Sequence, residues 1–209
     1  MYNHKEVEDA IIKSWNKEDI PGKVRKQSSK NKKKYYFMDG PPYATGHIHM
    51  GTALNKVLKD FAIRSHRMQA LDVFDRPGYD THGVPIELKV EKEIGVQSKQ
   101  DIEKYGVKKF VEKCKEFATK HIDTMNFEFD NLGVWMDWKN PYLTLDNKYI
   151  ESIWWTFKKA DEKKLLYLGK YPVHVCPRCE TAVAYNEIIY QKQEDNSIYV
   201  KFPLANDKN

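Results

Sequence analysis

Residues 40–51, GPPYATGHIHMG, hold three glycines, two prolines and two histidines in twelve positions. The apolar run YYF at 35–37 ends two residues before this stretch, and the residues after the stretch, 52–69, have the apolar spacing of a helix. A strand, a glycine-rich turn and a helix in this order begin a βαβ unit, whose strands are parallel. The stretch therefore predicts an α/β fold.

The flanking segments complete the unit. KYYFMDG at 34–40 predicts a buried strand that ends at Asp39, and LDVFDRPG at 71–78 predicts a second strand. Thr52 is a suitable N-cap for the helix between them. One face of that helix is apolar, the pattern of a helix packed on a core: Leu54, Val57, Leu58 and Phe61. Residues 35–76 are thus expected to form strand, loop, helix and parallel strand.

The N-terminal region predicts a short amphipathic helix over 5–16 that stops at Pro21 and Gly22. A basic loop is expected to follow, because 23–34, KVRKQSSKNKKK, hold seven cations and no carboxylate. Two interpretations stay open for this loop: a solvated mobile segment, or a contact to nucleic-acid phosphates.

Apolar residues at helical spacing occur in two further segments before about residue 165. A helix is predicted from Val107, with Cys114 in its apolar face, and another is opened by Asp146. Core packing is the expected role of four tryptophans: Trp135, Trp138, Trp154 and Trp155. Beyond about residue 165 short strands are expected instead, at 165–175, 187–193 and 197–204.

Composition excludes several classes of protein. With 41% hydrophobic and 31% charged residues, the chain of 209 residues is typical of a globular protein, and no stretch approaches the ~18 apolar residues of a membrane helix. Its polar, acidic N-terminus is unlike a signal peptide, so a cytoplasmic location without membrane contact is expected. Three cysteines, two of them in CPRC at 176–179, favour metal or redox chemistry over a disulfide framework.

The loop at 40–51 lies where open α/β folds bind ligands, at the carboxyl edge of the sheet. Glycines let a ligand approach the backbone, and the N-terminus of the following helix favours phosphate. The histidines are expected to donate hydrogen bonds. Neither the dinucleotide G-x-G-x-x-G pattern nor a Walker G-K-[ST] is present. A tight structural turn whose histidines only cap backbone groups is the alternative interpretation.

Two longer motifs carry a family resemblance. DGPPYATGHIHMGTALNKVLKD at 39–60, followed by RPGYDTHGVPIELKVE at 76–91, resembles the catalytic core of class I aminoacyl-tRNA synthetases, in particular the archaeal-type isoleucyl members. The family's His-x-Gly-His signature falls on 49–52, where Thr52 stands in the last position. The second signature, Lys-Met-Ser-Lys-Ser, is not in these residues.

The resemblance implies a fold and its division. The fold is expected to be the first half of a Rossmann-like parallel-sheet nucleotide-binding domain, followed by the β-rich start of an inserted zinc and editing domain. Its expected parts are an N-terminal helix and basic loop at 1–34, half of the catalytic domain at 35–165, a connective insertion at 166–196, and the beginning of the editing domain at 197–209.

The resemblance also implies a reaction, the ATP-dependent activation of isoleucine to isoleucyl-adenylate and its transfer to tRNA(Ile), with Mg²⁺ carried by the ATP. Mischarged valine would be edited by a downstream domain, and the full-length form is expected to be monomeric. The implied catalytic residues are His47, His49, Gly51 and Thr52. The implied ATP-binding residues are Gly46, His49, Gly51 and Thr52, and the implied isoleucine-binding residues are Gly40, Pro41 and Asp80.

Cys176 and Cys179 have the spacing of half a tetrahedral Zn²⁺ site. The resemblance places the other two ligands in a second cysteine pair; two reduced structural thiols are the alternative. For the whole chain, the alternative to a ligase is an inactive synthetase-derived module that binds tRNA or protein. A C-x-x-C redox protein is disfavoured, because no long amphipathic helix follows the motif.

Overall fold

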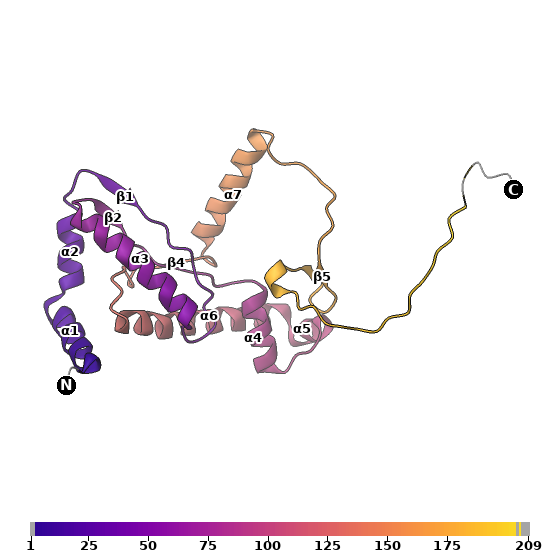
Figure 1. Ribbon diagram of the computed structural model, residues 1–209, viewed down its shortest axis with the longest axis horizontal. Coiled ribbons are helices and arrows are strands. Elements are labelled where there is room, and N and C mark those ends of the chain that lie inside the picture. The colour runs from indigo at the N-terminus through magenta and orange to yellow at the C-terminus, as the bar shows by residue number, and fades with distance from the viewer. Residues whose placement is uncertain (1–2, 204, 206–209) are drawn as a thin grey trace. The chain divides into compact units, whose positions relative to one another are not determined.

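The computed structural model describes residues 3–203 and 205, and it divides into two compact units, Met1–Tyr167 and Leu168–Asn209 (Figure 1). The first unit contains, in chain order, α1 (His4–Glu18), α2 (Ile20–Ser28), β1 (Lys34–Tyr36), α3 (Met50–Met68), β2 (Asp72–Phe74), β3 (Gly78–Tyr79), α4 (Val84–Ile94), α5 (Lys99–Tyr105), α6 (Val107–Asn131), β4 (Tyr142–Leu143) and α7 (Asn147–Glu162). The second contains β5 (Val175–Cys176), β6 (Thr181–Ala182) and a 3-10 turn at Tyr185–Glu187.

Two short parallel sheets organise the first unit. β1 pairs with β2, with Tyr35 opposite Val73, and β3 pairs with β4. The predicted order of strand, loop, helix and parallel strand is confirmed. β1 ends at Tyr36, three residues earlier than expected, because Asp39 turns inward to bind lysines of α3 and two prolines without N–H groups follow.

The prediction for the buried face of α3 is wrong. Its buried residues are Lys56, Asp60, Ile63 and Arg67. The predicted apolar face is exposed, with relative exposures of 61%, 44%, 60% and 71% at Leu54, Val57, Leu58 and Phe61. Three charged residues can be buried because each meets an opposite charge, from Asp39, Arg64 or Asp75.

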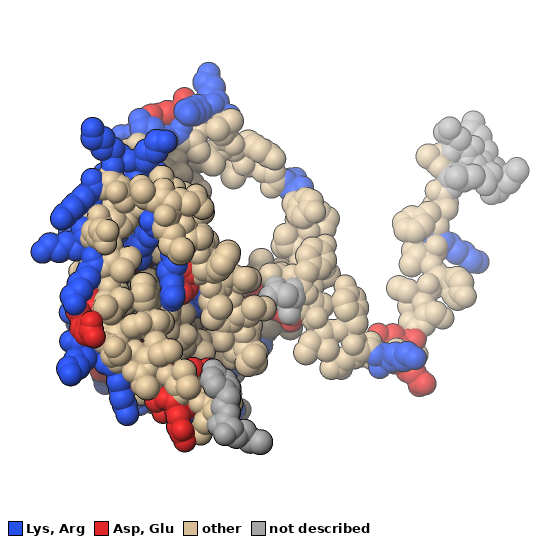
Figure 2. Space-filling view, turned by 60° about the vertical axis from the view of Figure 1, so that its left-hand side comes forward, with Lys and Arg blue, Asp and Glu red and all other residues tan. Residues whose placement is uncertain are grey.

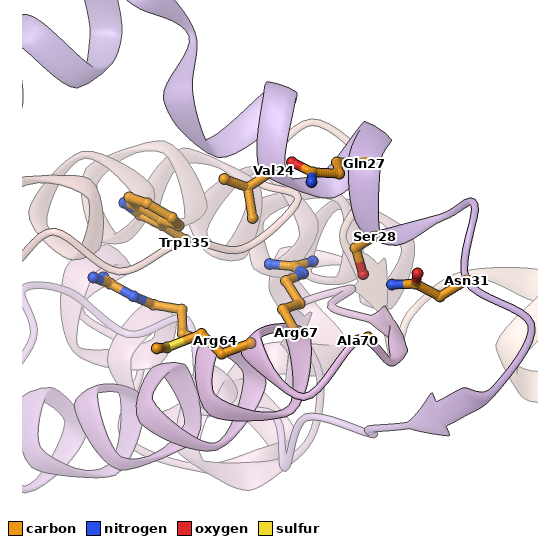
Figure 3. A pocket seen from close by; sticks show the side chains of 9 residues that line it. Val24, Gln27, Ser28, Asn31, Arg64, Arg67, Ala70 and Trp135 are labelled. Atoms are coloured by element: carbon orange, nitrogen blue, oxygen red, sulfur yellow. The ribbon is translucent and has the colours of Figure 1, made fainter.

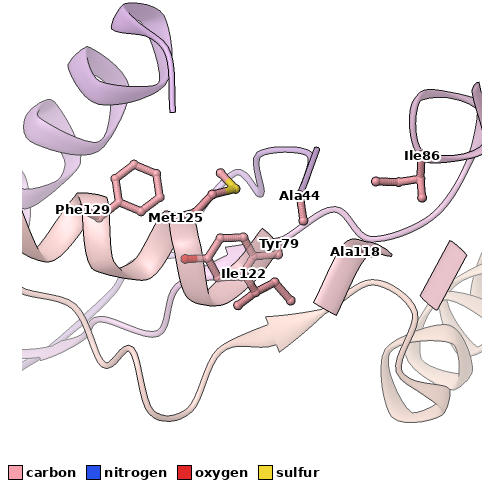
Figure 4. Close-up of a cluster of buried hydrophobic side chains, with 7 residues drawn as sticks. All are labelled: Ala44, Tyr79, Ile86, Ala118, Ile122, Met125 and Phe129. Carbon is pink, nitrogen blue, oxygen red and sulfur yellow. The ribbon is translucent and has the colours of Figure 1, made fainter. Parts of the chain in front are cut away.

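A cluster of buried apolar side chains lies between α6, α4 and the chain around β3 (Figure 4). Its members are Ala44, Tyr79, Ile86, Ala118, Ile122, Met125 and Phe129. Cys114 packs against this cluster as expected, and burial raises the pKa of its thiol to about 11. A second cluster joins α3 and β2 to the segment after α6: Ile63, Val73, Val134 and Met136. Trp138 packs against both clusters and so links them.

The predicted basic loop is partly helical, since α2 extends to Ser28. Pro21 lies in the first turn of α2, where its missing N–H costs nothing, so it begins this helix. The helix before it ends earlier, at Glu18, where Asp19 has a φ of +49°. Arg25 pairs with Asp75 at 2.9 Å, and the Ser28 hydroxyl donates to the carbonyl of Leu71 at 2.7 Å. These contacts attach the segment to β2.

In the second unit, β5 and β6 form an antiparallel pair with Cys176 opposite Thr181. The other predicted strands do not form within the described residues, where 188–203 have no ladder partner; Leu204, the last residue of the predicted 197–204 strand, lies outside them. No helix among the residues described is long and apolar enough to cross a membrane.

The predicted packing of α7 is also wrong. The helix begins after Asp146 as expected, but it contains no buried residue. Trp154 and Trp155 are 68% and 62% exposed.

Candidate active site at the carboxyl ends of the parallel strands

Backbone hydrogen bonds hold the glycine-rich loop against the chain that leaves β3. The N–H of Ala44 donates to the carbonyl of Asp80 at 3.0 Å, and the N–H of Asp80 donates to the carbonyl of Pro42 at 2.8 Å. Tyr43 and Asp80 thereby form a parallel bridge. The loop at 40–49 and Asp80 are therefore neighbours, although about 40 residues of sequence separate them.

Asp39 anchors the start of the loop. Its buried carboxylate accepts hydrogen bonds from the N–H of Gly78 at 2.9 Å, from Nζ of Lys59 at 2.6 Å and from Nζ of Lys56. Lys56 is only 1% exposed, and burial lowers its pKa even though Asp39 opposes this shift. Its ammonium also lies 5.2 Å from the ring centroid of Phe129. One carboxylate thus joins the loop, α3 and β3.

His49 is the N-cap of α3, which corrects the prediction of Thr52. The Nδ1 atom of His49 accepts from the N–H of Gly51 at 3.1 Å and from that of Thr52 at 3.3 Å. Thr52 itself lies in the first turn of the helix. This atom caps backbone N–H groups, the role that the alternative interpretation gave the histidines, rather than donating a hydrogen bond. Because Nδ1 accepts, the neutral ring carries its proton on Nε2, which leaves one N–H to donate outward.

Glu128 of α6 is a site residue that the sequence did not reveal. One of its carboxylate oxygens contacts Nδ1 of His47, and the other accepts from the N–H of Ile48 at 2.8 Å. The hydrogen bond from Ile48, and then that from His47, lower the pKa of Glu128. Nothing in the local sequence distinguishes this glutamate from the other carboxylates on a long amphipathic helix. It fixes the loop between its two histidines.

Asp80 also has a partner that the sequence did not indicate. Its Oδ1 atom accepts from the hydroxyl of Thr144 at 3.0 Å, while that hydroxyl oxygen accepts from the N–H of Thr81 at 2.9 Å. Thr144 follows β4, whose pairing with β3 brings it here. Asp80 is half-buried and is held in one orientation at the edge of the sheet.

The remaining predicted loop residues lie on the same continuous segment. The carbonyl of Gly40 accepts from Nζ of Lys59 at 3.0 Å, and Pro41 comes next, half-buried. Gly46 has a φ of +148°, a conformation that side chains disfavour. Gly51 is exposed on the first turn of α3. The structure thus brings all the predicted adenylate and amino-acid residues to one edge.

Cys176 and Cys179 lie in the second unit, at the turn between β5 and β6. Backbone N–H groups of Cys179 and Arg178 lower the pKa of Cys176, which favours the thiolate that a metal requires. The pKa of Cys179 is instead raised, by burial and by its contact with Cys176, so only one of the two thiols is favoured as a thiolate. The two thiols fit half of a tetrahedral site, and among the described residues no group of three or more potential ligands is found.

A family model described as tRNA synthetases class I (I, L, M and V) matches residues 10–203. The chain belongs to this family. Isoleucine–tRNA ligases from Methanothrix thermoacetophila and Methanocaldococcus jannaschii are each 51% identical to it, over 100% and 99% of the chain. That of Pyrococcus abyssi is 50% identical over 100% of it. The chain spans about a fifth of the length of these relatives, 20% in each case.

A solved structure confirms the synthetase fold. The crystal structure of the Agrobacterium radiobacter K84 agnB2 LeuRS, in a ternary complex with tRNA and LeuAMS, superposes with a TM-score of 0.60. It is 23% identical, and the match covers 90% of this chain and 21% of that one. The expected α/β fold of a class I synthetase catalytic domain is therefore confirmed, and its parallel sheets are small, with two strands each among the described residues.

Proposed function

We propose that the chain carries the adenylate-forming site of an isoleucine–tRNA ligase, with ATP, isoleucine and tRNA(Ile) as substrates. The observation that carries this proposal is the backbone bridge between the glycine-rich loop and Asp80, because it brings phosphate-binding groups and a carboxylate to one edge. The relatives named isoleucine–tRNA ligase support the choice of amino acid.

In this proposal the ATP phosphates lie over 46–52. The positive end of the α3 dipole faces that position. Nδ1 of His49 already accepts from the N–H groups of Gly51 and Thr52, and Nε2 of the same ring donates to the phosphate oxygens. Mg²⁺ arrives with the triphosphate, as hard cations do. Attack of the isoleucine carboxylate on the α-phosphorus releases pyrophosphate. It needs positioning and charge stabilisation rather than a protein nucleophile.

Asp80 accepts from the α-ammonium group of isoleucine, and Gly40 and Pro41 line the side-chain pocket. Thr144 and the bridge to the loop hold the aspartate in place. The domain division at 165 and 196, the zinc half-site at Cys176 and Cys179, editing of valine, a monomeric full-length protein and a cytoplasmic location belong to the same proposal.

The test is pyrophosphate exchange by the complete gene product. His49→Ala is expected to slow isoleucine-dependent exchange by two orders of magnitude or more, about 2.7 kcal/mol of transition-state stabilisation, with little change in the KM for isoleucine. Asp80→Asn is expected to impair isoleucine use while ATP binding is retained. His4→Ala, an exposed histidine of α1, is the control. Unchanged exchange in His49→Ala would remove His49 from the site, and no exchange by the wild type would favour an inactive module that binds tRNA or protein.

A further inference from the structure

A pocket of about 520 Å³ lies between α2, the last turns of α3 and the segment after α6 (Figure 3). Its lining is part apolar, from Val24, Met68 and Trp135, and part polar, from Gln27, Arg64 and Arg67. The pocket is separate from the adenylate site. His49 caps the beginning of α3 and Arg67 lies near its end, so at 1.5 Å per residue about 27 Å of helix separates them.

Arg67 lines this pocket and carries hydrogen-bond donors without a partner. Its side chain is 3% exposed, and Nη2 donates to the carboxylate of Asp75 at 2.8 Å. Its Nε and Nη1 atoms are buried without a partner, as is the indole Nε1 of Trp135. A buried donor left unpaired costs about 1–3 kcal/mol, so three at one pocket indicate a missing acceptor.

The charges around the pocket indicate the sign of that acceptor. Asp75 accepts from Arg25 as well as from Arg67. The Asp60 carboxylate accepts from Arg64 at 3.1 Å and from the backbone N–H of Trp135 at 2.8 Å. Both carboxylates are therefore already occupied, and neither accepts from Nε or Nη1 of Arg67. A guanidinium group with two free donors favours an acceptor that carries negative charge.

We propose that this pocket binds a phosphate group through Arg67 and the indole N–H of Trp135. Arginine suits phosphate because its planar group donates several hydrogen bonds with full charge. The volume exceeds that of a bare phosphate, and the apolar lining gives room for an organic substituent. The ligand is thus a phosphate ester, free in solution or in an RNA backbone. The lysines of 23–34 are close in sequence to the lining residues Val24 and Gln27. Figure 2 shows Lys and Arg gathered on one side of the first unit.

The test titrates the 209-residue chain with inorganic phosphate, AMP and a single-stranded RNA oligonucleotide, and follows the NMR signals of the Arg67 Nε–H and the Trp135 indole N–H. Both signals are expected to shift with phosphate and with AMP. Tighter binding of RNA, displaced by AMP, would identify an RNA backbone as the source; equal or weaker binding of RNA would identify a free ester. No shift with any of the three would overturn the proposal.

Gln27→Glu distinguishes this pocket from any other anion site without disturbing the ion pairs of Arg67. It adds a carboxylate to the lining, and like-charge repulsion is expected to weaken phosphate binding at least ten-fold. Gln100→Glu, the same change at an exposed position of α5, is expected to leave binding unchanged. Trp135→Phe keeps the ring but removes the indole donor, and it should weaken binding as well. Equal affinity in Gln27→Glu and wild type would place the anion elsewhere and contradict the proposal.

Discussion

Asp39 is the residue on which the position of the glycine-rich loop depends most, because it joins two lysines and a backbone N–H. Asp39→Asn would leave the ammonium of Lys56 buried without its counter-charge. We expect the free energy of unfolding to fall by about 3–5 kcal/mol, the usual cost of breaking a buried ion pair. Urea unfolding at pH 7 measures it.

The control for this prediction is Asp9→Asn, at an exposed position of α1, where a change within about 0.5 kcal/mol is expected. If Asp39→Asn were as stable as the control, Lys56 would have another stabilising partner, and Asp39 would not be the anchor of the loop.

Glu128 makes a pH-dependent contribution through the same loop. Since its pKa is lower in the folded chain than in the unfolded one, it stabilises the fold above the unfolded pKa, and this stabilisation is lost as the pH falls through the lowered value. Glu128→Gln lacks the titrating group. Thermal unfolding should therefore show wild type more stable than the variant at pH 7, with a difference that shrinks under acid conditions.

Glu112→Gln is the matched control for Glu128→Gln, since Glu112 is exposed on the same helix. This variant is expected to have the same thermal stability as wild type at every pH. If the difference in thermal stability between wild type and Glu128→Gln stayed the same in acid, the carboxylate would act by its shape and not by its charge.

Sequence reasoning found the site residues that lie on the loop but not those that support them. The glycines and histidines of 40–51 are adjacent in sequence, so their chemistry is visible as a motif. Glu128 and Thr144 reach the site only through the packing of α6 and the pairing of β3 with β4. The cap of α3 was misplaced because His49 uses a ring nitrogen where serine or threonine would use oxygen.

At the scale of elements, α3 presents its apolar face outward. Leu54, Val57, Leu58 and Phe61 are all exposed on this face. Contiguous apolar surface of this kind promotes association. Phe61→Glu is expected to reduce self-association of the 209-residue chain in sedimentation velocity, and to change the free energy of unfolding by less than about 0.5 kcal/mol.

Phe127→Glu is the comparison for this variant, because Phe127 is 68% exposed on α6 and lies outside the face of α3. It should leave association unchanged. If both variants, or neither, reduced association, the apolar face of α3 would not be the contact.

Among the elements, the βαβ unit was predictable from the sequence, but the face that its helix buries was not. The period of 3.6 residues locates the helix, and the turn residues locate its ends, since both are local properties. Which face is buried depends on partners elsewhere: Asp39 and Asp75 make the charged face of α3 the buried one. The strands expected at 187–193 and 197–204 do not form within the described residues for a similar reason. A strand needs a partner strand, and its own sequence does not identify that partner.

At the scale of the whole molecule, the first unit gathers its chemistry through pairing between distant segments. β1 with β2 and β3 with β4 bring together residues from before and after α3 and α6. The bridge of Tyr43 to Asp80 then connects the loop that follows β1 to the end of β3. The loop, Asp80 and Thr144 converge because each follows the carboxyl end of a strand, the usual position of ligand sites in α/β folds.

The second unit contains the candidate zinc half-site, whose affinity for Zn²⁺ a metal titration can measure. Cys176 and Cys179 supply two of the four ligands that a structural zinc prefers, so the 209-residue chain is expected to bind Zn²⁺ weakly and to lose it on dialysis. Cys176→Ser should abolish even this binding. Cys114→Ser should not, because Cys114 packs against the core of the first unit. One zinc per chain retained through dialysis, and lost in Cys176→Ser, would show that further ligands of this same chain complete the site.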